Sequence, residues 1–322
     1  MKDFDSQPSI IDASVAGLLS EAPLHSLNVD PQKNRLSVSF HEHIRTWAET
    51  AENVTQSLDS LGIKYVLMKV FLVPNARMDD VDLLVENEKD VHDALNMLRQ
   101  KGYSLYSDRY SLNPLKITAM PCKNNIQVDI YPEATWFNMR YAPTFFISSN
   151  SFKRDAWGFQ AYMPNPSLDV YIVATHSYNH GFISLAEAAH VVRLMSEHNL
   201  NWDLLKDLAD SYELNHALLI YLKIAQLCFK GDKNQYEISA SINEILQKDS
   251  LSRFYSEWFD RASKRGFPLK IPLKLRMLSA SVRLFRPNLN SYTNVYDEIL
   301  GYGLAFLYRG DRRSLKSRGL KF

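Results

Sequence analysis

The most informative segment of this chain is RMDDVDLLV, residues 77–85, where two carboxylates stand two positions apart at the start of an apolar run. Side chains of a β-strand alternate between its faces, so Asp80 and Asp82 point the same way, about 6–7 Å apart along the strand. Two acids this close repel each other unless a cation lies between them. Because Leu83, Leu84 and Val85 follow, the pattern predicts a strand rather than an exposed acidic loop.

A third carboxylate, Asp129, interrupts another apolar run, IQVDI at residues 126–130. If the two strands are neighbours, Asp80, Asp82 and Asp129 converge and suit two divalent cations, Mg²⁺ or Mn²⁺. The alternative is a solvated strand edge or a structural ion-pair site. We predict that the three side chains lie on adjacent strands with carboxylates about 4–8 Å apart, as catalytic and metal-binding residues.

The flanking sequence predicts a mixed sheet with helices around it. A helical apolar stripe over 41–61 ends at Gly62, a residue suited to the left-handed conformation after a helix. Further elements are expected as strands at 63–70, 78–86 and within 103–132, and as a helix at 87–103. The last two strands are joined at 123–125 by residues that favour a hairpin. Several strands after one helix indicate a mixed or antiparallel sheet.

The pattern changes after Pro164 and Pro166, where helical spacing runs to residue 229 with a break near Gly181. We therefore expect an α+β protein: a mixed-sheet domain with flanking helices, followed by an all-helical domain. The expected boundaries are an N-terminal arm at 1–40 with a short helix near 11–20, the α/β domain at 41–165, and the helical domain with a basic tail at 166–322.

Bulk composition argues against several classes of protein. The 322 residues carry a formal net charge of +1, so no overall charge bias indicates a nucleic-acid or membrane partner. Cys122 and Cys228 stand far apart, without a metal-binding spacing, and are expected to be buried free thiols. No signal peptide or transmembrane segment is evident, so a cytoplasmic protein is expected.

These motifs together resemble the DNA-polymerase-β-like nucleotidyltransferase superfamily, in its broad branch of bacterial and archaeal nucleotidyltransferases. The resemblance covers about residues 42–230. It is carried by Leu67-Met68-Lys69, by RMDDVDLLV, by the helix ending in Lys101-Gly102-Tyr103, and by Val128-Asp129-Ile130 at the position of the third carboxylate. It implies a nucleotidyltransferase-like sheet domain and a helical second domain.

The resemblance also implies an activity. A nucleoside monophosphate would pass from a nucleoside triphosphate, expected to be ATP, to a hydroxyl of an unknown small molecule, protein or RNA, with Mg²⁺ or Mn²⁺ as cofactor. Lys69 and Arg77 are the candidate cationic partners of the triphosphate. The alternative for both is an ordinary ion pair with Asp79 or Asp80.

His176 and His180 lie four positions apart and share one face of the predicted helix. This spacing can bind zinc, but the glutamate of the HExxH motif is missing, and a packed histidine pair is favoured. The resemblance instead places His176, Asn179 and His180 beside the nucleotide, as nucleotide-binding residues.

Two features keep other functions open. Val70-Phe71 follows Lys69 where the superfamily's phosphate turn has glycine and a small residue, which favours a nucleotide-binding or scaffolding protein without turnover. Basic residues also gather near the C-terminus, with seven between Lys264 and Arg286 and six after Tyr308. They suit RNA or another anionic partner, whereas the alternative is a solvated helix face and a disordered tail.

Overall fold

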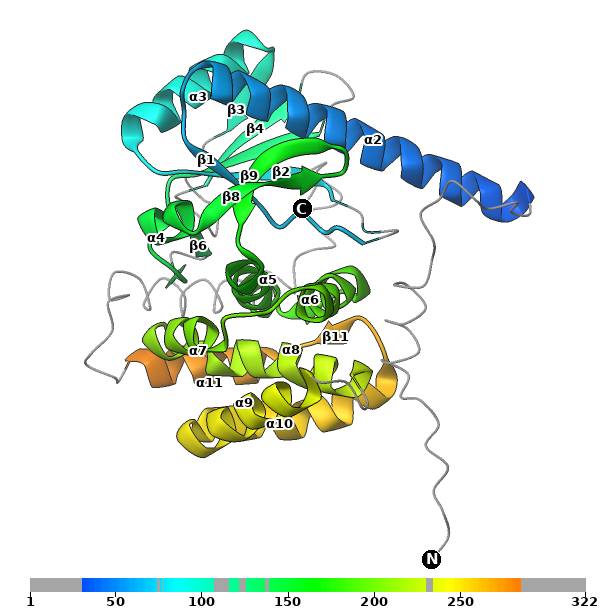
Figure 1. Cartoon of the computed structure of the whole chain (residues 1–322), viewed down its shortest axis with the longest axis vertical. Helices are drawn as coiled ribbons and strands as arrows, with labels where there is room; N and C mark the ends of the chain where they lie inside the picture. Colours follow the sequence, from blue (N-terminus) through cyan, green and yellow to red (C-terminus); the bar gives the residue numbers. More distant parts are fainter. Residues whose placement is uncertain are drawn as a thin grey trace, which may run out of the picture.

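The structure, a computed structural model, describes residues 31–73, 76, 78–106, 116–121, 126–136, 139–229 and 234–284. Its centre is a five-stranded sheet of order β1-β2-β5-β4-β3 (Figure 1). The strands are β1 (Tyr65–Met68), β2 (Asp80–Val85), β3 (Tyr103–Tyr106), β4 (Ile117–Pro121) and β5 (Gln127–Tyr131). Only the central β2–β5 pair is parallel, which confirms the predicted mixed sheet.

Two helices, α2 (Pro31–Ser60) and α3 (Glu88–Gln100), cover one face of this sheet. The predicted stripe of α2 is buried there, with Trp47 and Leu58 at most 1% exposed. The helix expected at 41–61 begins earlier, at Pro31, a residue that fits the first helical position. Part of the expected N-terminal arm is therefore helical, while the short helix expected near 11–20 lies outside the described residues.

A β-hairpin not predicted from the sequence packs against the edge of the five-stranded sheet. It consists of β8 (Ser151–Ala156) and β9 (Phe159–Pro164), paired antiparallel, and β9 packs beside β1 and α2. Three shorter elements precede it: β6 (Thr135–Trp136), β7 (Met139–Arg140) and α4 (Thr144–Ser149). The hairpin escaped prediction because β8 reads SFKRDA, in which polar residues hide the alternation expected of a strand.

The rest of the described chain is mainly helical. It contains α5 (Pro166–His180), β10 (Phe182–Ile183), α6 (Leu185–Glu197), α7 (Trp202–Ser211), α8 (Asn215–Cys228), α9 (Asn234–Lys248), α10 (Ser250–Ala262), a 3-10 turn (Ser263–Arg265), β11 (Leu269–Lys270) and α11 (Leu273–Leu284). The predicted break is confirmed at Gly181, which ends α5 with φ +76°. The strand β11 pairs with β10, which directly follows Gly181. The segment before α11 therefore lies beside the end of α5.

Helix α5, with α6 beside it, lies between the sheet and helices α7 to α11 (Figure 1). Most of its side chains are buried, and they share one apolar cluster with the other helices and with Val66, Met68 and Leu84 of the sheet. A second cluster lies between the opposite sheet face and α2, α3 and β9. We propose a domain division near residue 165 on this basis, with the first cluster extending across it.

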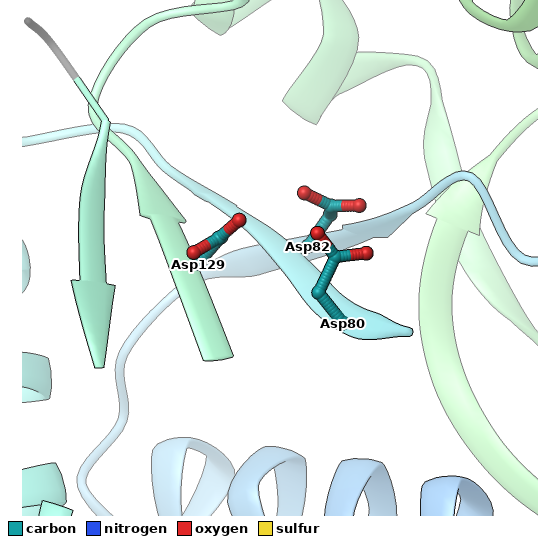
Figure 2. Close-up of side chains that lie close together, drawn as sticks. All are labelled: Asp80, Asp82 and Asp129. Atoms are coloured by element: carbon teal, nitrogen blue, oxygen red, sulfur yellow. The ribbon is translucent and has the colours of Figure 1, made fainter. Parts of the chain in front are cut away.

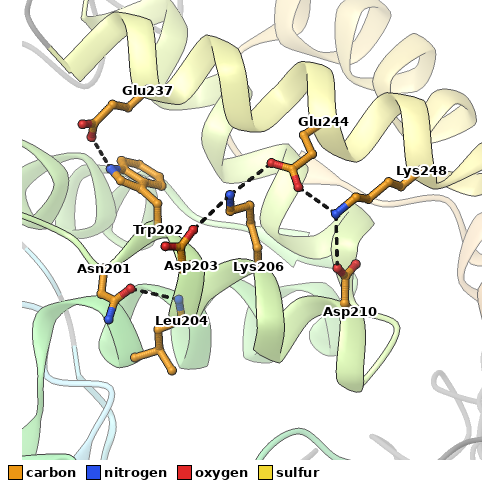
Figure 3. Close-up of polar contacts among 9 residues, drawn as sticks. All are labelled: Asn201, Trp202, Asp203, Leu204, Lys206, Asp210, Glu237, Glu244 and Lys248. Atoms are coloured by element: carbon orange, nitrogen blue, oxygen red, sulfur yellow. Dashed lines mark hydrogen bonds and ion pairs between the residues drawn. The ribbon is translucent and has the colours of Figure 1, made fainter.

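Charged side chains join α7 to α9 at the surface (Figure 3). Lys206 lies 3.0 Å from Glu244, which also accepts from Lys248 at 2.7 Å, and Trp202 Nε1 donates to Glu237. Exposed ion pairs of this kind contribute about 0–1 kcal/mol each. The packing of these helices therefore depends mainly on the apolar cluster beneath them.

The basic segment at 264–286 is not uniformly a surface feature. Arg276 of α11 is buried and donates to the carbonyl oxygen of Asn179 at the end of α5, at 2.8 Å. The side chains of Arg283 and Arg286 and the tail after Tyr308 lie outside the described residues. Cys228 is a partly buried cysteine, and Cys122 lies outside the described residues. No helix in the described ranges is both long and apolar enough to cross a membrane.

Candidate metal centre

The parallel pairing of β2 with β5 brings the predicted carboxylates together. Asp82 stands directly opposite Asp129, and Asp80 opposite Gln127. Carboxylate oxygens of Asp80, Asp82 and Asp129 all lie within 4.8 Å of one another. Figure 2 shows the three side chains on the same side of the two strands, with their carboxylates gathered together. The predicted geometry is confirmed.

Asp82 forms a buried ion pair with Lys69, whose Nζ lies 2.7 Å from Asp82 Oδ2. Lys69 directly follows β1 and adopts a left-handed backbone conformation, φ +57°, which turns the chain away from the strand. Its ammonium also lies 3.4 Å from the Tyr131 hydroxyl. Burial alone would lower the pKa of Lys69, but the charges of Asp82 and Asp80 outweigh it and raise this pKa. Lys69 therefore remains a cation inside the cluster.

Three donors hold Asp129, which is fully buried. Lys116 Nζ lies 2.7 Å from Oδ2, while Thr118 Oγ1 and Gln127 Nε2 donate to Oδ1 at 2.7 and 2.9 Å. These three residues were not predicted from the sequence. Lys116 lies just before β4 and Thr118 within it, two positions apart, so both can face Asp129 once the pairing of β4 with β5 is known.

Asp80 begins β2, and its carbonyl oxygen accepts a hydrogen bond from Trp47 Nε1 of α2 at 2.8 Å. The indole thus fixes the strand end that carries the first carboxylate. Burial and the nearby charge of Asp82 raise the pKa of the Asp80 carboxyl to about 8. A cation placed among the three acids would oppose both effects.

The donor set of this cluster fits a hard divalent cation. Its ligand atoms are all carboxylate oxygens, the type that Mg²⁺ and Mn²⁺ prefer. Asp82 Oδ1 is buried and has no hydrogen-bond partner among the described residues. Buried polar atoms are normally paired, so this oxygen is available to a ligand. The residues present therefore fit a divalent metal ion.

Comparison with known families agrees with this geometry. Residues 39–230, more than half of the chain, match the family described as uncharacterised nucleotidyltransferase. The chain belongs to this family. A search of curated proteins finds no match. The family match contains all three carboxylates of the cluster and extends through α8 of the helical half.

The segment after Lys69 departs from a glycine turn. Val70 is fully buried in the cluster formed with α2 and α3, and Phe71 packs against both apolar clusters. The amide nitrogen of Leu72 donates to His190 Nδ1 at 3.3 Å. This backbone donor is therefore already bonded within the protein. Arg77 lies outside the described residues, as do Pro74 and Asn75.

The three residues expected beside the nucleotide on the helical side, His176, Asn179 and His180, all lie in the last turns of α5. The rings of His176 and His180 are 4.3 Å apart in an edge-to-face arrangement, which agrees with the packed-pair interpretation. Burial, and then the positive charge of Lys69, lower the pKa of both histidines, so their neutral forms are favoured. Asn179 is 1% exposed, and neither polar atom of its side chain has a hydrogen-bond partner in the described structure.

Proposed function

We propose that this chain transfers a nucleoside monophosphate from a nucleoside triphosphate, with ATP as the expected donor, to a hydroxyl of a small molecule, protein or RNA. The observation that carries the proposal is the convergence of Asp80, Asp82 and Asp129 within 4.8 Å on one side of two parallel strands. Membership of the nucleotidyltransferase family supports the reaction class.

Asp80, Asp82 and Asp129 would hold Mg²⁺ or Mn²⁺ in this proposal. The bound ion would supply electrostatic stabilisation of the phosphate oxygens. Lys69 would add a second positive charge, since its buried ammonium is already held beside Asp82. Arg77, His176, Asn179 and His180 complete the proposed nucleotide site.

The proposed reaction is an in-line substitution at phosphorus. The acceptor oxygen forms a bond to the α-phosphorus, and the bond from that phosphorus to the β-phosphate oxygen breaks, which releases pyrophosphate. The hydroxyl proton passes to Asp129, the proposed general base. Lys116, Thr118 and Gln127 fix the orientation of this carboxylate.

A transfer assay tests this proposal. The full chain is incubated with each labelled nucleoside triphosphate, Mg²⁺ or Mn²⁺, and a cell extract, and labelled acceptors are sought. We expect metal-dependent labelling that is lost in Asp80→Asn, which removes a charge from the cluster while keeping the shape of the side chain. Asp79→Asn is the matched control, because Asp79 is adjacent in sequence but largely exposed. Equal labelling by the two variants would contradict the proposal.

A second candidate is nucleotide binding without turnover, favoured by the segment at Val70–Leu72. The position where a glycine turn would approach a phosphate holds a buried Val70, and the Leu72 amide is already bonded to His190. Calorimetry measures the binding of ATP with Mg²⁺, and the transfer assay measures turnover. The two measurements together distinguish the two candidates. Binding without transfer to any acceptor, together with transfer created by Val70→Gly, would support this second function.

A further inference from the structure

Both backbone polar groups of Leu72 are bound by side chains of α6. The amide nitrogen donates to His190 Nδ1 at 3.3 Å, and the carbonyl oxygen accepts a hydrogen bond from the Arg193 guanidinium. His190 and Arg193 are three positions apart, so they are neighbours on the helix surface. Residues 69–72 belong to no helix or strand. The backbone polar groups of Leu72 are therefore satisfied by these two side chains instead of by a neighbouring strand or helical turn. We refer to this arrangement as the Leu72 clamp.

The side chains of the Leu72 clamp are themselves held in place. His190 is fully buried, and its ring lies 5.6 Å from the ring of Phe71 in an edge-to-face arrangement. Because Nδ1 accepts from Leu72, the ring hydrogen is on Nε2, which lies 3.4 Å from Asp169 Oδ2 of α5. Arg193 Nε donates to Glu197 at 2.8 Å. Fixed side chains of this kind lose little freedom when they bind a backbone segment.

The Leu72 clamp lies three residues beyond Lys69. Between them, Val70 is fully buried and leaves the segment little freedom to rearrange. Lys69 itself holds a left-handed backbone conformation and places its Nζ 2.7 Å from Asp82. The position of this ammonium therefore depends on β1 on one side and on the Leu72 clamp on the other.

We propose that His190 and Arg193 are positioning residues for the transfer reaction: by binding both polar groups of Leu72, they fix the segment that presents Lys69 to the carboxylate cluster. This inference rests on the proposed function. It assigns to α6, which contributes none of the three carboxylates, a direct influence on the site. It also means that the triphosphate is bound by side chains and not by the Leu72 amide.

Arg193 is the better of the two residues to replace, since its side chain is 39% exposed whereas His190 is fully buried. The variants are Arg193→Met, which keeps the aliphatic part, and Arg193→Lys, which keeps a cationic donor. Arg253→Met is the matched control. Arg253 of α10 also donates to a backbone carbonyl, that of Leu246 in α9 at 2.9 Å, but this hydrogen bond is exposed. All are compared as full chains.

The first measurement is steady-state kinetics of the transfer reaction. We expect Arg193→Met to raise the KM for the nucleoside triphosphate about tenfold, because Lys69 is no longer held beside the phosphate site. Arg193→Lys should recover part of this loss, and Arg253→Met should match the wild type. A merely structural role for Arg193 would lower the amount of active protein, and hence the apparent kcat, without changing KM. An unchanged KM in Arg193→Met overturns the positioning role.

The second measurement does not depend on catalysis. Hydrogen exchange of the backbone amides at 69–73, followed by mass spectrometry, should be about tenfold faster in Arg193→Met than in the wild type or Arg253→Met. Unchanged exchange would show that the Leu72 clamp does not restrain this segment, and would overturn the proposal whatever the activity. A wild type that transfers to no acceptor would instead remove the proposed function, and the positioning role with it, while the exchange result would still report on the restraint.

Discussion

At the scale of single residues, two lysines act as internal counter-ions of the carboxylate cluster. Lys69 pairs with Asp82 and Lys116 with Asp129, each at 2.7 Å. Both ammonium groups lie close to oxygens that would also bind a metal ion. The cluster can therefore assemble in the metal-free protein, because the repulsion among its three acids is partly neutralised. The same positive charges compete with an incoming cation.

Replacing Lys116 tests this competition. We expect Lys116→Met to increase the affinity of the nucleotide-free protein for Mn²⁺ about tenfold, which corresponds to ~1.4 kcal/mol, because one positive charge beside Asp129 is removed. Titration calorimetry with Mn²⁺ measures the affinity. Lys153→Met is the control, since Lys153 pairs with Asp59 on the outer surface at 3.4 Å. A lower affinity in Lys116→Met would show that Lys116 supports the site instead of competing for it.

The histidine pair of α5 predicts how the stability of the metal-free protein depends on pH. The pKa values of His176 and His180 are lowered in the folded protein, first by burial and then by Lys69. The unfolded chain, with ordinary histidine pKa values of about 6.5, therefore binds protons first as the pH falls. We expect the free energy of unfolding to decrease from about pH 7 to pH 5, and to decrease less steeply in the double variant His176→Asn/His180→Asn. Urea unfolding at several pH values measures this, and identical slopes in both proteins would refute it.

The carboxylates were predictable from sequence because each interrupts an apolar strand, and alternation fixes the face of Asp80 and Asp82 without knowledge of the fold. The contacts of Lys116 and Thr118 with Asp129 were not, because they depend on hairpin register. A symmetric turn centred on Asn124 would place Ala119 opposite Asp129, whereas the structure pairs Thr118 with it. A shift of one residue exchanges the two faces of a strand. His190 and Arg193 depend on tertiary packing, which strand and helix periodicity do not determine.

At the scale of elements, the junction after α5 depends on a close approach between two segments. Gly181 has φ +76°, and a Cβ at this position would collide with the guanidinium of Arg276. That guanidinium donates to Asn179 O, at the end of α5. The absence of a side chain at Gly181 thus leaves room for the Arg276 guanidinium of α11 beside the end of α5.

We expect Gly181→Ala to lower the free energy of unfolding by about 2–4 kcal/mol. Roughly 1 kcal/mol comes from the left-handed conformation, and the rest from displacing Arg276 and leaving a buried carbonyl unpaired. Gly102→Ala is the matched control: Gly102 has φ +86° and follows the end of α3, but no neighbouring atom lies within 4 Å of the added Cβ. Chemical denaturation measures both variants. Equal losses of unfolding free energy in the two variants would mean that Arg276 moves aside without destabilising the protein.

Elements with a strong apolar period were predicted close to their observed bounds. The strand expected at 78–86 is β2, and the helix expected at 87–103 is α3, whose cap is Asn87. The β8–β9 hairpin was missed because consecutive residues of β8, Phe152 and Lys153, are both exposed, so the strand lacks the alternation of apolar and polar side chains that a half-buried strand shows. Its burial against β1 and α2 is a tertiary property.

At the scale of the whole molecule, the sheet domain and the helical half share one apolar cluster. Val66, Met68 and Leu84 of the sheet are at most 1% exposed, and they belong to the cluster that contains α5. Their burial therefore depends on residues beyond 165. The proposed division separates a sheet-containing segment from a helical one along the chain. Because the apolar cluster crosses this division, the stability of each half depends on the other.

We expect a fragment of residues 31–165 to be unstable alone, because removing α5 exposes an apolar sheet face. Circular dichroism during heating should show no cooperative transition, and a dye that binds apolar surface should bind strongly. Co-expression with residues 166–284 is the control and should restore a cooperative transition. A fragment that unfolds cooperatively on its own would show that α2, α3 and the sheet are sufficient for a stable core.

The contact between Gly181 and Arg276 joins a residue inside the family match at 39–230 to one outside it. Relatives that carry an arginine at the position of 276 should therefore keep glycine at the position of 181. Relatives whose chains end or diverge after residue 230 are free of this restriction, and other residues can accumulate there. A side chain larger than hydrogen at this position should therefore mark the relatives in which the contact between α5 and α11 is missing.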